Sequence, residues 1–366
     1  MTNVLHVHSG NLYGGVETFL VTLARSRSLA PAMAMSAALC FDDRIAAELR
    51  REGVRTCILG ATRIRRPDSI WRARHALAQR LRDDRVDVAV CHQAWPLALF
   101  GSIVKAAGVR LVSWVHMAQA GRHWIERLAR RIEPDLIVCN SRFTASTLPP
   151  TSTRVEIVYP PLRFASSAPN ARSAIRQELN TPENDVVIAQ VSRMESLKGQ
   201  TVCLEALAPL RDQPGWTCWQ VGGAQRPGEH RYLDSLHAAA AQLGIAHRIR
   251  FTGERADVPD LLAASDIFCQ PNLGPEGFGL SFVEAMAAGV PVVTSAIGGA
   301  LEIVDDTCGV VVRAGDAPAL SAALRRLIED RGTRARLQQG GPRRAQALCD
   351  PSAQMHLIEG LMASAW

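Results

Sequence analysis

Short apolar runs alternate with stretches of helical pattern along most of the chain. In the first half, the runs that predict β-strands are 4–8, 54–59, 86–91, 109–115 and 136–139. In the second half, they are 186–191, 217–221, 249–252, 267–270, 290–294 and 309–312. Strands separated by helices of roughly ten to fifteen residues favour parallel sheets covered by helices on both faces. The pattern therefore predicts an α/β fold built on doubly wound parallel sheets.

The alternation is interrupted at Pro160-Pro161 and in the polar stretch 165–185, and we place a domain boundary there. A chain of 366 residues with 47% hydrophobic content is long enough for two domains with sizeable cores. We therefore expect a first domain over 1–164, a second domain over 165–349, and a terminal helix over 350–366.

The cysteines give no sign of a disulfide framework or a structural zinc site. Their number, nine, is odd, and none forms a C-x-x-C pair or a histidine-flanked metal pattern. The sequence opens on an apolar run typical of a strand rather than of a leader, and no stretch reaches the length of a membrane span. These features predict a cytoplasmic protein.

Positive charge is concentrated in the first part of the chain. Residues 1–160 hold 22 Arg plus Lys against 13 Asp plus Glu, a net +9, whereas residues 161–366 hold 19 against 22, a net −3. Arg63, Arg65 and Arg66 belong to the most basic segment. The excess favours an acidic partner, such as an anionic membrane surface or a phosphate-linked acceptor, and a merely solvated arginine-rich surface is the alternative. We expect no nucleic-acid partner, because no binding motif is present and aromatic residues that could stack on bases are few.

Two glutamates, Glu276 and Glu284, stand eight positions apart on either side of a predicted helix start. The segment 274–279 is rich in turn formers, and 280–288 is a run of good helix formers closed by Gly289. Glu276 is therefore expected on a loop and Glu284 inside the helix. The alternative is a solvated loop followed by an ordinary surface helix.

The backbone between these glutamates has the features of an anion site. The amides of Phe278, Gly279 and Leu280 are expected at the helix N-terminus, where unpaired N–H groups and the positive end of the helix dipole bind phosphate. Carboxylates bind sugar hydroxyls as strong acceptors. A carboxylate on each side of a phosphate site, Glu276 and Glu284 here, therefore suits a nucleotide sugar.

A second candidate cluster follows the predicted strand 186–191. Lys105 and Lys198 are the two lysines among 41 basic residues, so Lys198 is a marked choice in this chain. Arg193 and Lys198 are expected at the carboxyl end of the strand, where ligands of parallel sheets collect. An arginine fork and an ammonium group can neutralise a diphosphate and stabilise the charge that builds on it as it leaves. The alternative is again a solvated loop.

Smaller signals come from the first domain. Gly14-Gly15 lies between the first predicted strand and a helix over 16–24, where paired glycines allow a tight turn and close approach to phosphate. His116 stands at the carboxyl end of a predicted strand, and a structural and a functional role are both open for it. Ser141 is interpreted as a helix cap.

The segment from Glu276 to Val293 resembles the E-x7-E signature of the retaining glycosyltransferases of family 4. It shares the Glu-Gly-Phe-Gly-Leu core and the Glu-Ala-Met-Ala-Ala-Gly-Val-Pro-Val-Val continuation. The five-residue offset between Arg193 and Lys198, and the Gly14-Gly15-Val-Glu element, are also similar to elements of that family. The chain departs from the pattern in its loop, which is one residue longer between Pro271 and Glu276 and has asparagine in place of a serine.

The resemblance implies roles for these residues. Glu276 would face the transferred sugar, and Glu284 would hold the ribose. Arg193 and Lys198 would meet the donor diphosphate, with Gly14-Gly15 opposite the donor phosphates, and His116 would touch the transferred sugar. The implied architecture is GT-B, two Rossmann-like domains facing each other across a cleft, with the terminal helix returning to the first domain.

These observations predict a retaining glycosyltransferase that moves a hexose-type sugar from a nucleoside-diphosphate sugar to an acceptor hydroxyl. Its acceptor would be a glycan, a lipid-linked sugar or a small molecule in bacterial surface glycan, glycolipid or related synthesis, and the enzyme could sit peripherally on the inner face of the membrane. No Asp-x-Asp occurs in the sequence, so we expect no metal and no cofactor besides the donor. The alternatives are a GT-B-fold nucleotide-sugar epimerase and a non-catalytic nucleotide-sugar binding subunit.

Overall fold

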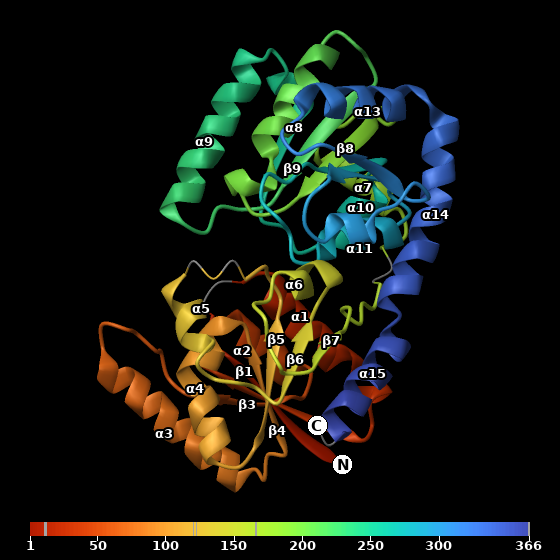
Figure 1. The fold of residues 1–366 in the computed structure, drawn as a ribbon. Helices are drawn as coiled ribbons and strands as arrows, with labels where there is room; N and C mark the ends of the chain where they lie inside the picture. The colour runs from red at the N-terminus through yellow and green to blue at the C-terminus, as the bar shows by residue number, and fades with distance from the viewer. Residues whose placement is uncertain (11–12, 120, 122, 165–166, 365–366) are drawn as a thin grey trace. The chain divides into compact units, whose positions relative to one another are not determined.

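The computed structural model describes residues 1–10, 13–119, 121, 123–164 and 167–364, and it divides into two compact units. The first unit comprises Met1–Arg163 together with Cys349–Trp366, and the second comprises Phe164–Leu348. Each unit has its own parallel sheet and its own hydrophobic core (Figure 1).

The first unit is built on a seven-stranded sheet. In chain order its strands are β1 (Thr2–His8), β2 (Met33–Leu39), β3 (Arg55–Ile58), β4 (Val88–His92), β5 (Arg110–Val115), β6 (Leu136–Cys139) and β7 (Val155–Ile157). Across the sheet the order is β3-β2-β1-β4-β5-β6-β7, with every pairing parallel. The direction of growth reverses between β1 and β4, which makes this the topological switch point of the sheet.

The second unit repeats the plan with a six-stranded sheet. Its strands are β8 (Val186–Val191), β9 (Trp216–Val221), β10 (Ile249–Gly253), β11 (Ile267–Gln270), β12 (Val292–Ser295) and β13 (Gly309–Val312). The order across the sheet is β10-β9-β8-β11-β12-β13, with parallel pairings. Here the direction reverses between β8 and β11, so the switch point lies between these two strands.

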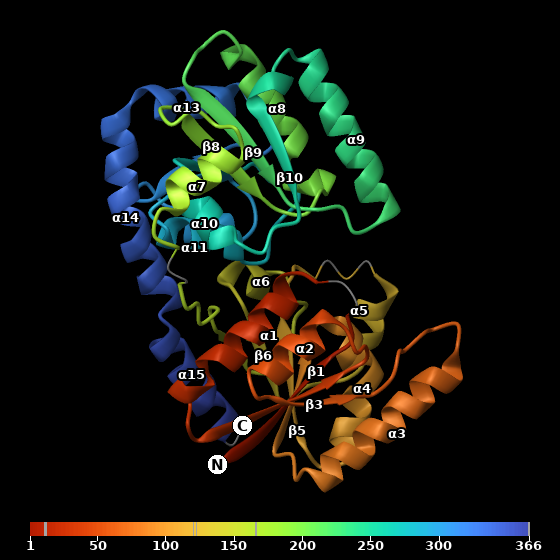
Figure 2. The ribbon, with the colours of Figure 1, turned by 180° about the vertical axis from the view of Figure 1, so that it is seen from behind.

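Helices cover both faces of each sheet (Figures 1 and 2). In the first unit they are α1 (Gly15–Ser26), α2 (Arg44–Arg51), α3 (Pro67–Asp83), α4 (Ala94–Ala106), α5 (Trp124–Ala129), α6 (Arg142–Ser146) and α15 (Pro351–Ala363). The helices α7 (Ala171–Glu178), α8 (Gln200–Leu207), α9 (Pro227–Gln242), α10 (Val258–Ala263), α11 (Leu280–Ala287), α12 (Ala300–Ile303), α13 (Ala317–Glu329) and α14 (Arg331–Cys349) follow the first unit's strands along the chain and precede α15. Within the described ranges, none of these helices is both long and apolar enough to cross a membrane.

The last helix, α15, belongs to the core of the first unit. Met355, Ile358, Leu361 and Met362 are buried in a cluster that also contains residues of β1, β4, β5 and α1. Nη2 of Arg110 donates to the carbonyl oxygen of Met362 at 2.9 Å. Residues from near the end of the described chain thus complete a core formed by its beginning.

The predicted α/β fold with parallel sheets is confirmed, and each apolar run interpreted as a strand coincides with one. Two strands were missed. β2 is made largely of alanine, methionine and serine, which carry little strand preference, and β7 is a three-residue edge strand. The polar stretch interpreted as an interruption contains α7, whose apolar face is limited to Ala171 and Ile175.

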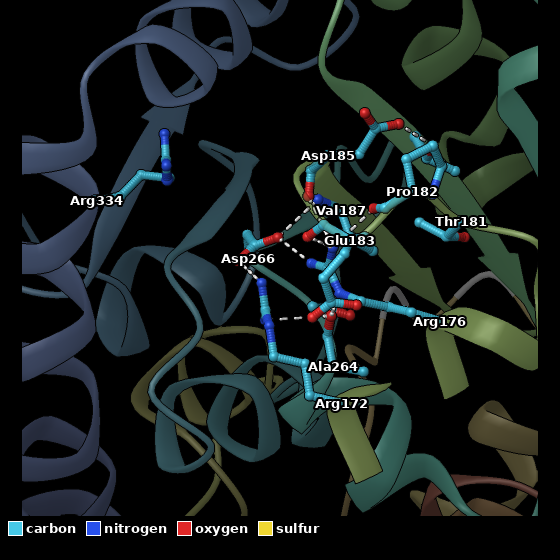
Figure 3. A network of polar contacts seen from close by, with 12 residues as sticks. Arg172, Arg176, Thr181, Pro182, Glu183, Asp185, Val187, Ala264, Asp266 and Arg334 are labelled. Carbon is cyan, nitrogen blue, oxygen red and sulfur yellow. Dashed lines mark hydrogen bonds and ion pairs between the residues drawn. The ribbon is translucent and has the colours of Figure 1, made fainter. Parts of the chain in front are cut away.

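The polarity of α7 has a structural reason in Arg176, which is fully buried (Figure 3). Its guanidinium donates to Oδ2 of Asp266 at 2.6 Å, and that oxygen also accepts from the amide of Val187 at 2.8 Å. Further donations at 2.9 to 3.2 Å go to the carbonyl oxygens of Pro182, Glu183, Asp185 and Ala264. Since Val187 lies at the start of β8 and Asp266 directly precedes β11, Arg176 fastens α7 to the amino ends of both strands.

Replacing Arg176 by alanine should destabilise the second unit by about 3–5 kcal/mol, because Asp266 would be left partly buried without its charge partner. The control is Arg172→Ala. Arg172 contacts the other oxygen of the same carboxylate at 2.9 Å, but its side chain is 44% exposed, so the loss should stay below about 1 kcal/mol. Urea unfolding followed by tryptophan fluorescence measures both values, and equal losses would contradict the role given to Arg176.

Candidate functional site

Lys198 and Glu276 meet at the switch point of the second sheet. Lys198 ends a short 3-10 turn between β8 and α8, and Glu276 lies in the loop between β11 and α11. Nζ of Lys198 is 2.7 Å from Oε2 of Glu276. The two side chains are 22% and 25% exposed, so the ion pair is accessible but shielded from bulk water on most sides.

Polar side chains at the strand ends hold this pair. Nδ2 of Asn272 donates to Oε2 of Glu276 at 3.3 Å, and Oδ1 of Asn272 accepts from Nε2 of Gln270 at 3.1 Å. Nε2 of Gln190 donates to the backbone carbonyl of Lys198 at 2.8 Å. The asparagine that departs from the family pattern therefore has a role here, because it is buried and orients Glu276.

The loops after β8 and β11 are fastened to each other through their backbones. Gly199 has φ +76°, and a Cβ atom there would lie 1.9 Å from the carbonyl oxygen of Pro271, so only glycine fits. The amides of Leu273 and Gly274 both donate to the carbonyl of Leu197, at 2.9 and 3.2 Å. This contact fixes the separation of Lys198 and Glu276 independently of their side chains.

The start of α11 provides backbone donors beside Glu276. Gly279 caps the helix with φ +99°, and a Cβ atom there would collide with the ring of Phe282. Phe278 is buried and secures the loop. The amides of Gly279 and Leu280 make no hydrogen bond to any described residue. Two N–H groups and the positive end of the helix dipole are thus available to an anion.

Glu284 lies one turn into α11 and is partly buried. Within the described part of the chain its carboxylate makes no hydrogen bond and no ion pair. Burial raises the pKa of this carboxyl above its ordinary value. A partly buried acceptor without a donor costs free energy, which a ligand hydroxyl would recover.

The structure does not bring Arg193 into the Lys198–Glu276 pair. Arg193 follows β8, and its guanidinium forms an ion pair with Glu195 and lies 3.6 Å from Oε1 of Glu229, at the start of α9. No contact between Arg193 and either Lys198 or Glu276 occurs among the described residues. Arg193 can reach an anion at this edge only by exchanging its present carboxylate partners.

In the first unit, Gly14 and Gly15 open α1, directly beyond the carboxyl end of β1. The reason proposed for the pair from sequence, a tight turn, is wrong, because neither glycine has a φ in the left-handed region. A Cβ atom at Gly15 would meet nothing within 4 Å, and one at Gly14 would lie 3.7 Å from Oε2 of Glu17. These glycines leave the backbone at the helix start open to approach.

Glu17 of the same element holds the loop onto the sheet. It is buried, its Oε2 accepts from the amide of Gly14 at 2.9 Å, and its Oε1 lies 2.7 Å from Nε2 of His8. A Cβ atom on Gly10 would fall 2.6 Å from that histidine nitrogen, so the loop passes directly over the pair.

His116 follows β5 directly and is 7% exposed. Its Nε2 lies 2.9 Å from Nδ1 of His92, at the end of β4. Burial lowers the pKa of His116 to about 3, so the ring is neutral at physiological pH. The interpretation of Ser141 as a cap is confirmed, since its Oγ accepts from the amide of Thr144 at the start of α6.

Sequence reasoning missed several polar residues that surround the candidates: Gln190, Glu229, Gln270, Asn272 and His92. Three of them, Gln190, Gln270 and His92, are buried polar residues at or near the carboxyl ends of otherwise apolar strands. That position was a usable signal, because a buried polar side chain needs a partner and the carboxyl edge is where ligands bind.

Comparisons with known proteins agree with this geometry. Residues 171–344 match the family described as Glycosyl transferases group 1, and residues 13–164 match Glycosyltransferase Family 4. The chain is 30% identical over 378 residues to a GDP-mannose-dependent alpha-(1-6)-phosphatidylinositol monomannoside mannosyltransferase of Mycolicibacterium smegmatis, covering 95% of this chain and 90% of that protein.

Other similarities are shorter or more distant. A D-inositol 3-phosphate glycosyltransferase of Salinispora tropica is 36% identical over 234 residues, which span 58% of this chain and 48% of that protein. The chain thus spans about half the length of this relative. The crystal structure of Anabaena Alr3699/HepE in complex with UDP and glucose has a TM-score of 0.88 at 24% identity, with both chains fully covered.

Proposed function

Since the chain belongs to glycosyltransferase family 4, we propose that it transfers a hexose-type sugar from a nucleoside-diphosphate sugar to an acceptor hydroxyl, with retention of configuration. The observation that carries this proposal is the arrangement around α11. A carboxylate without a partner, two free backbone amides and a Lys–Glu pair follow one another along the switch point of a parallel sheet. This sequence of groups matches the ribose, diphosphate and sugar of such a donor.

Each group has a separate proposed role. Glu284 accepts hydrogen bonds from the ribose hydroxyls, and the amides of Gly279 and Leu280 bind the diphosphate. Lys198 neutralises the charge that develops on the leaving diphosphate, and Arg193 joins it after releasing its carboxylate partners. Glu276 orients the transferred sugar.

In the proposed reaction, the bond between the anomeric carbon and the diphosphate oxygen breaks while the acceptor oxygen attacks from the same face. The acceptor proton passes to an oxygen of the leaving diphosphate, so the products are the glycoside and the free nucleoside diphosphate. No divalent ion is required, because protein cations and amides take the developing charge. The roles proposed for Gly14, Gly15 and His116, toward the donor phosphates and the transferred sugar, rest on the family resemblance.

The acceptor is proposed to be a glycolipid or a related surface glycan. The relative from M. smegmatis is named for a phosphatidylinositol mannoside acceptor. Arg63, Arg65 and Arg66 are all exposed in the segment before α3, beside two exposed apolar side chains, Ile64 at 51% and Trp71 at 67%. Basic and interfacial apolar groups together suit an anionic membrane surface.

Lys198→Ala should lower turnover at least about tenfold, roughly 1.4 kcal/mol of transition-state stabilisation. The chain supplies its own control in Lys105, its other lysine, which pairs with Asp135 at 3.4 Å on the first unit and should be replaceable without effect. Donor turnover is measured with a panel of UDP-, GDP- and ADP-sugars in excess EDTA. Normal turnover in folded Lys198→Ala would remove the lysine from the mechanism, and a requirement for added manganese or magnesium would refute the metal-free reaction.

Glu284→Ala and Glu276→Gln should impair different steps. The ribose does not change during transfer, so loss of Glu284 should chiefly weaken binding of the donor and the free nucleotide. Glu276 is proposed to face the reacting sugar, so Glu276→Gln should lower the single-turnover rate and leave nucleoside-diphosphate affinity nearly intact. Calorimetry and single-turnover rates separate the two effects. The assignment is reversed if Glu276→Gln abolishes nucleotide binding while Glu284→Ala does not.

Replacing Arg63, Arg65 and Arg66 together by glutamine should reduce binding to anionic vesicles, and salt should weaken the binding of the unsubstituted chain. The control replaces Arg325, Arg326 and Arg331, three exposed arginines of the second unit, and removes the same charge. Co-sedimentation with anionic and neutral vesicles measures the difference. If both triple variants lose binding equally, net charge alone explains it and the basic segment is no docking surface.

A further inference from the structure

Three buried histidines of the first unit form a continuous hydrogen-bonded chain. Nδ1 of His6 lies 2.9 Å from Nε2 of His92, and Nδ1 of His92 lies 2.9 Å from Nε2 of His116. The rings are nearly parallel, with interplanar angles of 25° and 24°. The side chains come from β1, from β4 and from directly after β5, which are neighbours in the sheet on either side of its switch point.

The chain is closed at one end and open at the other. His6 and His92 are 1% and 0% exposed, and His116 is 7% exposed. Nε2 of His6 is buried without a partner, and Nδ1 of His116 makes no hydrogen bond to a described residue. The rings of Phe19 and Trp114 pack against both His92 and His116, so the imidazoles cannot turn freely.

All three rings are neutral at physiological pH. Burial lowers the pKa of His6 to about 4, that of His116 to about 3 and that of His92 well below its ordinary value. The other titratable groups at this end of the sheet are the paired His8 and Glu17, and the charge of His8 acts in the same direction on His92 and His116.

Neutrality restricts where the protons can be. A neutral imidazole carries one N–H, and each hydrogen bond between two rings needs one N–H and one bare nitrogen. If His92 is protonated at Nδ1, then His6 and His116 must both be protonated at Nδ1 as well. If His92 is protonated at Nε2, so are the other two. The three rings therefore share one tautomer.

The closed end selects between these two arrangements. Protonation at Nε2 throughout would leave a buried N–H of His6 without an acceptor, and orphaned buried N–H groups are rare in native proteins. Protonation at Nδ1 throughout leaves only a lone pair there and puts an N–H on the open nitrogen of His116. The same closed end prevents proton conduction, because a proton entering at His116 would be trapped as a buried imidazolium on His6.

We propose that His92, backed by His6, is a positioning residue that holds His116 as a fixed donor, with its Nδ1–H directed at a hydroxyl of the bound sugar. The contact with a sugar rests on the proposed function. The shared tautomer does not, since it follows from the hydrogen bonds alone.

Two-bond ¹⁵N–¹H correlation spectra of the histidine-labelled full chain at pH 7 test the tautomer. We expect three neutral rings, all protonated at Nδ1, with signals assigned by single substitutions. Free histidine prefers protonation at Nε2, so this result would be diagnostic. Different tautomers within the trio, an imidazolium at pH 7, or protonation at Nε2 throughout would each overturn the proposal.

Two substitutions of His92 test the positioning role. Asparagine places its amide near the former Nδ1 and keeps a partner for His116, whereas glutamine reaches the former Nε2 and keeps a partner for His6. We expect His92→Gln to lower kcat/KM for the donor sugar about two- to tenfold relative to His92→Asn, the range of one hydrogen bond. Both variants should bind the free nucleoside diphosphate equally and unfold at similar temperatures.

Equal kcat/KM values in the two variants would overturn the positioning role. If the unsubstituted chain binds no nucleotide sugar, the proposed function fails instead, and the spectra still decide whether the three rings share a tautomer. The spectra use the unsubstituted chain for the decisive comparison, so poor folding of a His92 variant leaves the test of the shared tautomer intact.

Discussion

Every strand of both sheets runs parallel to its neighbours, and this constraint decides where chemistry can gather. All carboxyl ends lie on one edge of a parallel sheet, and only at a reversal of strand order do two adjacent loops leave in opposite directions. In the second unit the reversal separates β8 from β11, and Lys198 and Glu276 follow these two strands. In the first unit it separates β1 from β4, where the histidine chain lies.

The charges of the second unit are already paired in the structure. Lys198 contacts Glu276, and Arg193 contacts Glu195 and Glu229. A diphosphate would therefore exchange partners with these cations rather than meet bare charge, and its affinity would be the difference between two sets of contacts. The pairing also holds the cations near the place where charge develops, which limits reorganisation during the reaction. The amides of Gly279 and Leu280 need no such exchange.

The sequence predicted the strands of both units well because buried parallel strands are near-continuous apolar runs. It failed for β2, whose alanines and methionines suit a helix as well as a strand, and for α7, whose buried arginine looked like surface polarity. At the site, the roles of Glu276 and Lys198 could be argued from motif spacing, but their contact could not, since it joins residues 78 positions apart. The occupied state of Arg193 was equally invisible, because Glu229 reaches it from another helix.

The packing of α15 has a consequence for the order of folding. The first unit buries Met355, Ile358, Leu361 and Met362 beside strands that the ribosome delivers first. These side chains emerge only after the whole second unit has been synthesised. The usual vectorial order, in which the amino-terminal domain matures first, is therefore inverted here. The second unit can close its core during translation, while the first exposes one apolar face of its sheet until the final helix leaves the exit tunnel.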